Sequence, residues 1–254
     1  MKAIFITVRT SSTRLPQKCL LPFGNARTIE FLIRRLKRSK LAEAIILCTT
    51  ENREDDILCE IATQEGIKFF RGSERDKLSR WAGAARQFNV DFFVTADGDD
   101  LFCEAELIDL CFKQYDETGA DFIEQEGLIC GCFTYGLKAA ALYKVCEIKD
   151  SEDTEMMWVY FKDTGLFRCE TLRDAPAPFQ RPEIRMTLDY EDDLRFFSAC
   201  AEPFFKKGRY DFTLRDIMQV LNEHPEIIEI NQHRQEEFLA NQQAKTTLVL
   251  KGAQ

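Results

Sequence analysis

Apolar and polar positions alternate along the first 120 residues in a pattern that predicts strands followed by helices. Short apolar runs predict strands over 3–8, 44–49, 67–70 and 91–96. The run over 3–8 is rich in β-branched and aromatic residues and contains no Pro or Gly. Helical spacing of apolar residues between them predicts helices from about residue 28 and over 54–64, 76–88 and 104–117. This alternation predicts an α/β fold whose sheet is mostly parallel, with right-handed crossovers.

The rhythm changes after residue 120. Short strand-like pieces over 121–124, 128–134 and 165–172 surround predicted helices over 136–148 and 152–160. Beyond them the pattern predicts a strand over 184–188, a helix directly after it, helices over 213–223 and 233–242, and an edge strand over 246–250. Because no linker, repeat or low-complexity tract occurs, we expect a single domain over 1–254 with a middle section at about 121–182.

Charge and composition narrow the function classes. The net charge of −9 over 254 residues argues against a general nucleic-acid or anionic-membrane surface. The ten cysteines are scattered and form no C-x-x-C pair, so we interpret them as buried, reduced thiols rather than zinc ligands. The apolar run at the N-terminus is too short for a signal peptide or a membrane span, which predicts a cytoplasmic protein with no membrane partner. The basic residues of the first helix, at 34, 35, 37 and 38, are interpreted as a solvated face.

The loop that follows the first strand carries the candidate chemistry. Arg9, Arg14 and Lys18 supply three cations, and residues 10–13 supply four hydroxyls. Loops at the carboxyl ends of parallel strands bind ligands in open α/β folds, and cations with hydroxyls suit a phosphate chain. The alternative is an ordinary basic surface loop.

Two acidic segments also follow predicted strands. Asp97, Asp99 and Asp100 come after the fourth strand, and Asp189 comes after the strand at 184–188. Carboxylates at neighbouring strand ends face one cleft and favour Mg²⁺ or Mn²⁺. Asp-Gly-Asp is also a common turn, and the acidic residues after Asp189 could simply favour the start of a helix. Together with the cationic loop, however, these carboxylates indicate a site for a nucleoside triphosphate and a metal.

The residues that compose these segments resemble those of a known family. Arg9-x-x-Ser12-Thr13-Arg14-Leu15-Pro16-x-Lys18 after a strand is similar to the opening motif of the cytidylyltransferases that make CMP-activated sugar acids, such as acylneuraminate and 3-deoxy-manno-octulosonate (Kdo). The chain looks most like the spore-coat polysaccharide type. Three further segments resemble that type: Arg71-Gly72-Ser73-x-x-Asp76-x-Leu78-x-Arg80, Gly98-Asp99, and Leu188-Asp189-Tyr190-x-Asp192-Asp193-Leu194.

The resemblance implies a three-layer α/β/α nucleotidyltransferase fold with a mixed, mostly parallel sheet. It also implies CTP as substrate, Mg²⁺ as cofactor, and a homodimer formed through the middle section, which would also help to bind the acceptor. In the implied site, Arg9, Arg14 and Lys18 are catalytic and hold the triphosphate, and Asp99 and Asp189 bind the metal. The remaining implied nucleotide-binding residues are Ser12, Thr13, Arg71, Ser73, Asp76 and Arg80.

The chain departs from the family pattern at four places. Ser11 and Gln17 replace glycines of the loop, and Asp100-Leu101 replaces the Cys-Pro that often follows Gly-Asp. In the middle section, Glu152-Asp153-Thr154 stands where Arg-Glu-His often occurs. These changes put the phosphate geometry and the acceptor in question.

The predicted function is transfer of CMP from CTP to a sugar acid, with release of pyrophosphate, in surface polysaccharide synthesis. One alternative is a Mn²⁺-dependent nucleotide-sugar glycosyltransferase, because Asp97-Gly98-Asp99 is a D-x-D motif. Another is a non-catalytic member of the family that acts as an assembly partner. The sequence identifies neither the acceptor nor a general base.

Overall fold

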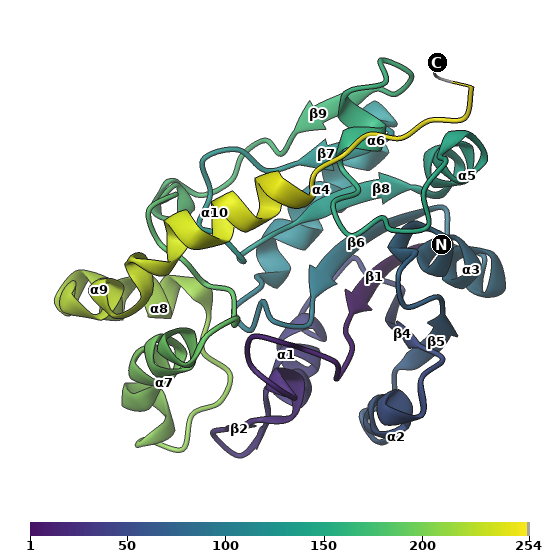
Figure 1. The fold of residues 1–254 in the computed structure, drawn as a ribbon. Coiled ribbons are helices and arrows are strands. Elements are labelled where there is room, and N and C mark those ends of the chain that lie inside the picture. The colour runs from purple at the N-terminus through teal and green to yellow at the C-terminus, as the bar shows by residue number, and fades with distance from the viewer. Residues whose placement is uncertain (253–254) are drawn as a thin grey trace.

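A mixed sheet forms the centre of the computed structural model, which describes residues 1–252 (Figure 1). In that part of the chain the main sheet has seven strands in the order β5–β4–β1–β6–β8–β7–β9. Their bounds are Lys68–Gly72 (β5), Ala44–Thr50 (β4), Lys2–Thr7 (β1), Phe92–Asp97 (β6), Tyr135–Lys138 (β8), Phe122–Glu124 (β7) and Cys169–Thr171 (β9). Strand β8 runs antiparallel to both of its neighbours, and the other pairs are parallel. The mixed, mostly parallel sheet is confirmed.

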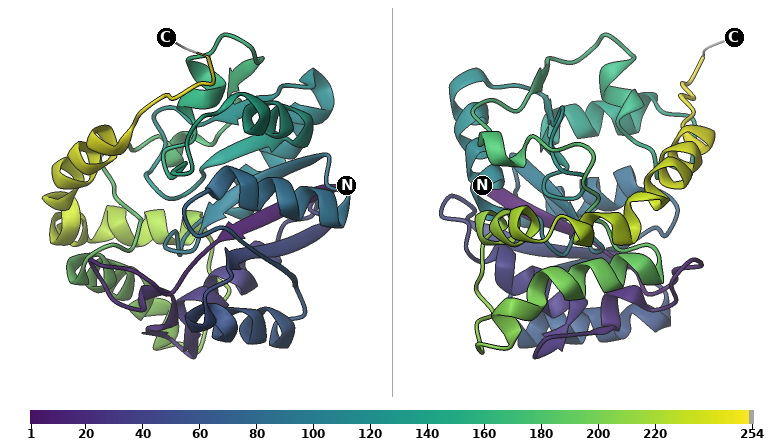
Figure 2. Two further views of the ribbon diagram at one scale, coloured as in Figure 1. Left: turned by 45° about the vertical axis from the view of Figure 1, so that its right-hand side comes forward. Right: turned by 90° about the vertical axis from the view of Figure 1, so that its left-hand side faces the viewer.

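Helices cover both faces of this sheet (Figures 1 and 2). One group packs into the same core as Ile4 and Ile6 of β1: α1 (Thr28–Leu36), α2 (Asp56–Gln64), α4 (Ala105–Thr118), α7 (Glu191–Phe205) and α8 (Leu214–Glu223). A second group packs into the core that contains Ala3 and Phe5: α3 (Lys77–Phe88), α5 (Ala139–Ile148) and α6 (Val159–Lys162). Because successive side chains of a strand point to opposite faces, one strand serves both cores. The three-layer α/β/α fold is therefore confirmed.

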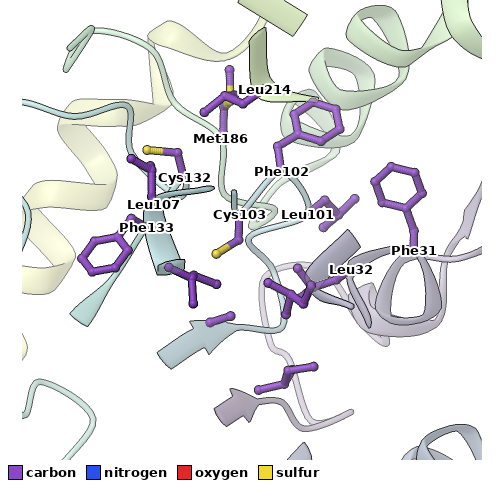
Figure 3. Close-up of a cluster of buried hydrophobic side chains, with 14 of the residues drawn as sticks. Phe31, Leu32, Leu101, Phe102, Cys103, Leu107, Cys132, Phe133, Met186 and Leu214 are labelled. Carbon is purple, nitrogen blue, oxygen red and sulfur yellow. The ribbon is translucent and has the colours of Figure 1, made fainter. Parts of the chain in front are cut away.

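The first core is continuous from the sheet to the C-terminal helices. Figure 3 shows Phe31 and Leu32 of α1 close to Leu101, Phe102 and Cys103, which follow β6. All of these side chains are at most 4% exposed. Leu214 of α8 belongs to the same cluster, so the C-terminal helices pack on the segment that leaves β6. Helix α9 (Glu226–Gln232) packs on this core through its isoleucines, and α10 (Arg234–Lys245) then crosses to the side of the sheet opposite α4 (Figures 1 and 2).

The strand order places a change of direction beside β1. From β1 the chain proceeds outward to β4 and β5, and it then returns to β6 on the other side of β1. Crossovers that diverge from one strand leave an open crevice at its carboxyl end, which is where ligands bind in such sheets. The short hairpin β2 (Pro22–Phe23) and β3 (Ala26–Arg27) and the 3₁₀ helix η1 (Lys18–Leu20) follow the loop at this point.

The predicted elements of the first 120 residues agree with the structure to within about two residues at each end, but several later predictions are wrong. Strand β8 lies in the segment predicted to begin the helix over 136–148, and the predicted strands over 128–134 and 184–188 meet in only one isolated bridge, Cys130–Arg185. The helix predicted over 152–160 is confined to α6, and the 246–250 strand is a single bridge to Lys149. Helix α9 was not predicted. The role of the middle section in acceptor binding and dimer formation stays a prediction.

The basic face of α1 is only partly solvated, contrary to the prediction. Arg35 is 4% exposed. Its guanidinium donates to Glu104 Oε2 at 2.7 Å and to the carbonyl oxygens of Cys103 and Phe212. Glu104 also accepts the backbone N–H of Leu214, at 2.7 Å. This buried pair joins α1, the segment after β6 and the start of α8, so its role is structural.

Two other expectations concern thiols and membranes. All ten cysteines are free, and most are buried as predicted, but Cys169 is exposed. Within residues 1–252, none of the helices has both the length and the apolar character needed to cross a bilayer.

Candidate active site

The loop after β1 is held in place by a buried aspartate. Asp55 Oδ1 accepts the backbone N–H and the hydroxyl of Thr10 at 2.8 and 2.7 Å, and Asp55 Oδ2 accepts the hydroxyl of Thr50 at the end of β4. Asp55 belongs to the 3₁₀ helix η2 (Arg53–Asp55) and is 2% exposed. One carboxylate therefore fixes the loop to the neighbouring strand.

The loop also explains one departure from the family pattern. Gln17 has φ of 52° and ψ of 31°, a left-handed conformation that glycine adopts without strain. A glycine at this position is thus suited to the turn that leads into η1. Ser11, in contrast, has an ordinary negative φ, so the backbone of this chain accepts a side chain there.

Four of the predicted residues converge at the carboxyl ends of the strands. Lys18 Nζ lies 2.5 Å from Asp99 Oδ2 and 2.8 Å from Asp189 Oδ1, and Arg14 Nη2 lies 2.6 Å from the same Oδ1. Asp189 is 1% exposed, whereas the side chain of Arg14 is 37% exposed. The expectation that the loop cations and the two distant aspartates lie together is met for Arg14 and Lys18, whereas Arg9 contacts the carbonyl of Glu74 instead.

Backbone contacts bring the two aspartates side by side. The N–H of Leu188 donates to the carbonyl oxygen of Asp99 at 2.9 Å, so the segment before Asp189 is attached directly to the segment after β6. At the same turn, Gly98 passes close to β1: a Cβ on Gly98 would lie 2.6 Å from a methyl carbon of Val8. The Asp-Gly-Asp sequence therefore reflects close packing of the chain against β1 as well as carboxylate chemistry.

The electrostatics differ between the two aspartates. Burial alone would raise the pKa of Asp189, but the adjacent cations Lys18, Arg14 and Arg185 outweigh it and lower this pKa. For Asp99, burial and the nearby carboxylates of Asp189 and Asp97 raise the pKa, and Lys18 offsets this only in part. Burial also lowers the pKa of Lys18, yet the two carboxylates reverse this effect and raise it overall. An added cation at this position would favour the ionised form of Asp99.

A second group forms at the start of the same loop. Arg9 Nη1 and Arg80 Nη1 each donate to the backbone carbonyl of Glu74 at 3.3 Å, and Arg80 also donates to the carbonyl of Ser73. The Glu74 carboxylate accepts from Ser11 and Asn52 at 3.1 and 3.0 Å. Arg9 and Arg80 therefore lie together, but no contact joins them to the aspartates.

The other predicted nucleotide-binding residues have partners within the fold. Arg71 donates to Asp56 and to the carbonyl oxygens of Thr50 and Asn52. Ser73 Oγ accepts the N–H of Asp76 at 3.1 Å. Asp76 caps α3 through Ser79 and accepts from Lys149 and Thr154. The structure places Ser12 and Thr13 in the loop, half-buried and exposed respectively. Their roles toward a nucleotide stay predictions.

The altered middle-section segment has a structural role at this point. Thr154 is 1% exposed and lies at the N-terminus of α3, where its hydroxyl accepts the N–H of Leu78 and donates to Asp76 Oδ1, both at 3.0 Å. The middle section is thereby attached to the helix that follows β5. Thr154 makes these contacts at the position where the family pattern often has a histidine.

The remaining acidic residues face other partners. Asp97 Oδ1 accepts from Lys77 Nζ at 3.1 Å, and the Lys77 ammonium lies 5.0 Å from the centre of the Trp81 ring. Asp100 is 4% exposed. Its pKa is well above the ordinary value because of burial and the nearby carboxylates of Asp99 and Asp97. Neither residue contacts Arg14 or Lys18 in the described part of the chain.

Sequence reasoning missed Asp55, Glu74 and Arg185, which organise the site. Asp55 lies at the start of a predicted helix and Glu74 lies in a polar turn. Both positions are typical of solvent-exposed acidic residues. Arg185 lies in a predicted apolar strand, where an isolated arginine is itself a signal, because a buried charge requires a partner. Its contacts with Asp189 are described below.

The carboxylate pair fits a hard divalent cation. Oxygens of Asp99 and Asp189 lie within 2.8 Å of one ammonium nitrogen, so both reach a single point. Residues 1–252 contain no cluster of three or more His, Cys, Asp or Glu side chains arranged to hold a metal. Two carboxylates are the usual protein contribution to a Mg²⁺ site that is completed by phosphate oxygens and water.

We expect Asp55 to stabilise the protein in a pH-dependent way. Burial would raise its pKa, but hydrogen bonds from Thr50 and Thr10 place it below the ordinary value of 3.8. A lowered pKa means that the stabilisation is present above 3.8 and is lost as the pH falls through the folded-state value. Asp55→Asn should therefore lower the free energy of unfolding at pH 7 by about 1.5–3 kcal/mol. Urea unfolding should show a smaller difference from wild type below pH 3.8. An equal difference at both pH values would contradict this assignment.

Comparison with known proteins identifies the family of the chain. Residues 3–198 match the family model described as "Cytidylyltransferase". The chain is 28% identical over 229 residues to the spore coat polysaccharide biosynthesis protein SpsF of Bacillus subtilis, covering 87% of this chain and 94% of that protein. It is 26% identical over 192 residues to a 3-deoxy-manno-octulosonate cytidylyltransferase of Chlorobium chlorochromatii, covering 74% of this chain and 68% of that protein.

A solved structure extends the similarity to the fold. The structure of a cytidylyltransferase from Leptospira borgpetersenii superposes with a TM-score of 0.80 at 28% identity, over 89% of this chain and 96% of the other. The range matched by the family model, residues 3–198, includes the loop cations and both aspartates.

Proposed function

Because the chain belongs to the cytidylyltransferase family, whose members are CTP-dependent nucleotidyltransferases, we propose that it transfers CMP from CTP to a sugar acid and releases pyrophosphate. The observation that carries this proposal is the contact of Lys18 with Asp99 and Asp189, together with that of Arg14 with Asp189. Two cations suited to a triphosphate and two carboxylates suited to a metal are in contact beyond the carboxyl end of β1, which supports the proposal.

The loop cations would act on the phosphate chain. In the proposed reaction a hydroxyl of the acceptor attacks the α-phosphorus of CTP in line with the bond to the β-phosphate. The new P–O bond joins CMP to the acceptor, the hydroxyl proton passes to water, the bond to the β-phosphate breaks, and pyrophosphate leaves with the bonding electron pair. Arg9, Arg14 and Lys18 would hold the β- and γ-phosphates and stabilise the charge that develops on the leaving pyrophosphate.

Arg14 is the residue most able to do this directly, because its side chain is more than one-third exposed. Lys18 is less exposed and is held by both aspartates, so its transfer to a phosphate oxygen would require a replacement cation between the carboxylates. This links nucleotide binding by the loop to metal binding by the two aspartates.

We propose Mg²⁺ as that cation, held by Asp99 and Asp189. When bound it would lower the pKa of an acceptor hydroxyl and neutralise charge on the α-phosphate. The support is the donor set, two carboxylates whose oxygens reach one point. No side chain at this point is a clear general base, because both carboxylates are paired with cations.

The acceptor class rests on the relatives and on the opening motif of the loop. A Kdo cytidylyltransferase and a spore-coat polysaccharide protein are both among the similar proteins, which favours a sugar acid used in polysaccharide synthesis. The family match is to cytidylyltransferases rather than glycosyltransferases, so the D-x-D alternative has less support. The Asp97 carboxylate pairs with Lys77 rather than with the cations of the loop.

The proposal can be tested by pyrophosphate release. The full-length protein with Mg²⁺ should release pyrophosphate from CTP only when the correct acid is present, so a panel of 3-deoxy-2-keto sugar acids is supplied in turn. UTP, GTP and ATP serve as controls for the nucleotide. Binding of CTP without turnover for any acid would instead support a non-catalytic member of the family, and a preference for a UDP- or GDP-sugar would support the glycosyltransferase alternative.

A further inference from the structure

The carboxylate of Asp189 is held from two sides. Its Oδ1 faces the loop, where it accepts from Arg14 and Lys18. Its Oδ2 points the other way and accepts from Arg185 Nη2 at 2.8 Å. Because the two oxygens have different partners, the carboxylate cannot rotate without losing a contact. Arg185 therefore helps to fix the orientation of the carboxylate, with one oxygen directed at Arg14 and Lys18.

Arg185 is itself fixed by a buried aspartate. Its Nε donates to Asp193 Oδ1 at 3.0 Å, and its Nη2 lies 3.3 Å from Asp193 Oδ2. Asp193 Oδ2 also accepts the backbone N–H groups of Asp189 and Tyr190, at 2.8 and 2.9 Å. One carboxylate thus holds both the arginine behind Asp189 and the backbone of Asp189.

The same unit extends into the C-terminal helices. Asn231 Nδ2, on α9, donates to Asp193 Oδ1 at 2.9 Å and to the backbone carbonyl of Arg185 at 3.1 Å. The Arg185 guanidinium lies 4.4 Å from the centre of the Phe238 ring on α10. Both helices lie beyond residue 198, where the match to the family model ends.

Burial makes this arrangement stiff. Arg185, Asp193 and Asn231 are each at most 1% exposed. A buried guanidinium is stabilised when its charge is paired, and here two aspartates share it through Nε and Nη2, while Nη1 is buried without a hydrogen-bond partner. Loss of one member leaves a buried charge or polar group without a partner, so the members maintain one another's geometry.

We propose that Arg185 and Asn231 are positioning residues that, through Asp193, aim Asp189 Oδ1 into the crevice and so set the affinity of the site for a divalent cation. The inference rests on the proposed function, in which Asp189 binds the metal. Groups that hold a metal-ligating carboxylate in this way usually change metal affinity about 10–100-fold when altered. Helix α9 thereby contributes to the site through the contacts of Asn231 with Asp193 and with the backbone of Arg185.

The test measures binding of Mn²⁺ to the full-length protein in the presence of CTP, by the loss of the free-ion signal in electron paramagnetic resonance. Arg185→Lys keeps the positive charge but loses the planar guanidinium that donates to both Asp189 and Asp193. It should weaken Mn²⁺ binding about 10–100-fold. Asn231→Leu removes both amide hydrogen bonds at similar volume and should weaken it about 10-fold. The affinity for CTP in the absence of metal should change by less than about threefold, because Arg9 and Arg14 are not altered.

Matched controls are Arg195→Lys on α7 and Asn241→Leu on α10, which alter exposed residues of the same types. Both should bind Mn²⁺ as wild type does. Thermal unfolding identifies any variant that fails to fold. If Arg185→Lys fails to fold, the test rests on Asn231→Leu. Wild-type Mn²⁺ affinity in both folded variants would overturn the inference, as would an equal loss of metal-free CTP binding, which indicates a merely structural role. Failure of the wild-type protein to bind Mn²⁺ with CTP would overturn the proposed metal site as well.

Discussion

Asp99→Asn is expected to lower the rate of pyrophosphate release by about 10³-fold or more. The substitution preserves the shape of the side chain but removes the charge that lies 2.5 Å from Lys18 Nζ. In the proposed reaction it removes one of two carboxylates that hold the metal, and a bound metal supplies several kcal/mol of charge stabilisation. Since about 1.36 kcal/mol corresponds to a tenfold change in rate, several kcal/mol gives the expected loss.

The measurement is the initial rate of pyrophosphate formation at saturating CTP, acid acceptor and Mg²⁺, with Mn²⁺ binding measured in parallel. Asp91→Asn is a suitable control. Asp91 immediately precedes β6, at the amino end of the strand that leads to Asp99, and its side chain is 77% exposed. It should retain the wild-type rate. If Asp99→Asn also retained it, Asp99 would have no role in metal binding, and the convergence of the two aspartates would be only structural.

Much of this site could be predicted from the order of its strands. Parallel strands end at one edge of a sheet, so a cationic loop after β1 and carboxylates after β6 had to lie near each other. Asp189 shows the limit of this reasoning. The segment before it was predicted as a strand, but it makes a single bridge, and it reaches the site through the Leu188–Asp99 backbone hydrogen bond. The predicted location was right although the predicted element was wrong.

The errors after residue 120 have a common physical cause. Tyr135–Lys138 precedes a run of alanines, so local propensity favours helix there, yet the segment pairs with β6 on one side and β7 on the other. Pairing between strands distant in the sequence outweighs helix propensity in such short segments. Helix α9 has only seven residues and follows Pro225, and a helix of that length gives little periodic signal.

Long-range polar contacts were also beyond prediction. Asp55 contacts Thr10 across 45 positions, and Asn231 contacts Asp193 across 38. No spacing rule relates such residues, because their proximity depends on how the complete chain packs. The loop cations and the candidate metal-binding aspartates could be found because their chemistry is unusual for a loop, whereas the residues that support them have side chains that are common everywhere.

In the proposed reaction Lys18 competes with the metal for the two carboxylates and also stabilises the leaving pyrophosphate. Replacing it should therefore strengthen metal binding and lower the reaction rate. In the structure its ammonium joins Asp99 and Asp189 at 2.5 and 2.8 Å, which is the point at which the proposed metal would bind. A divalent cation must therefore displace it before both carboxylates are available. Lys18→Met removes this competitor, so Mn²⁺ should bind more tightly to the nucleotide-free variant than to wild type. In the absence of metal the variant should be less stable, because the buried Asp189 and the half-buried Asp99 lose their shared partner.

The rate should change in the other direction. Without the ammonium that would move to the leaving pyrophosphate, Lys18→Met should lower the rate of pyrophosphate release by about 10²–10³-fold. Lys2→Met is a matched control, since Lys2 is also a partly buried lysine of the N-terminal segment, pairs with Asp116 at 2.6 Å, and lies at the amino end of β1. It should leave both the rate and the metal affinity as in wild type. Weaker metal binding by Lys18→Met would show that the ammonium does not compete for the carboxylates, whereas a wild-type rate would show that Lys18 does not act on the leaving group. A tighter metal site in a slower enzyme is the combination that only exchange of Lys18 between carboxylates and phosphate explains.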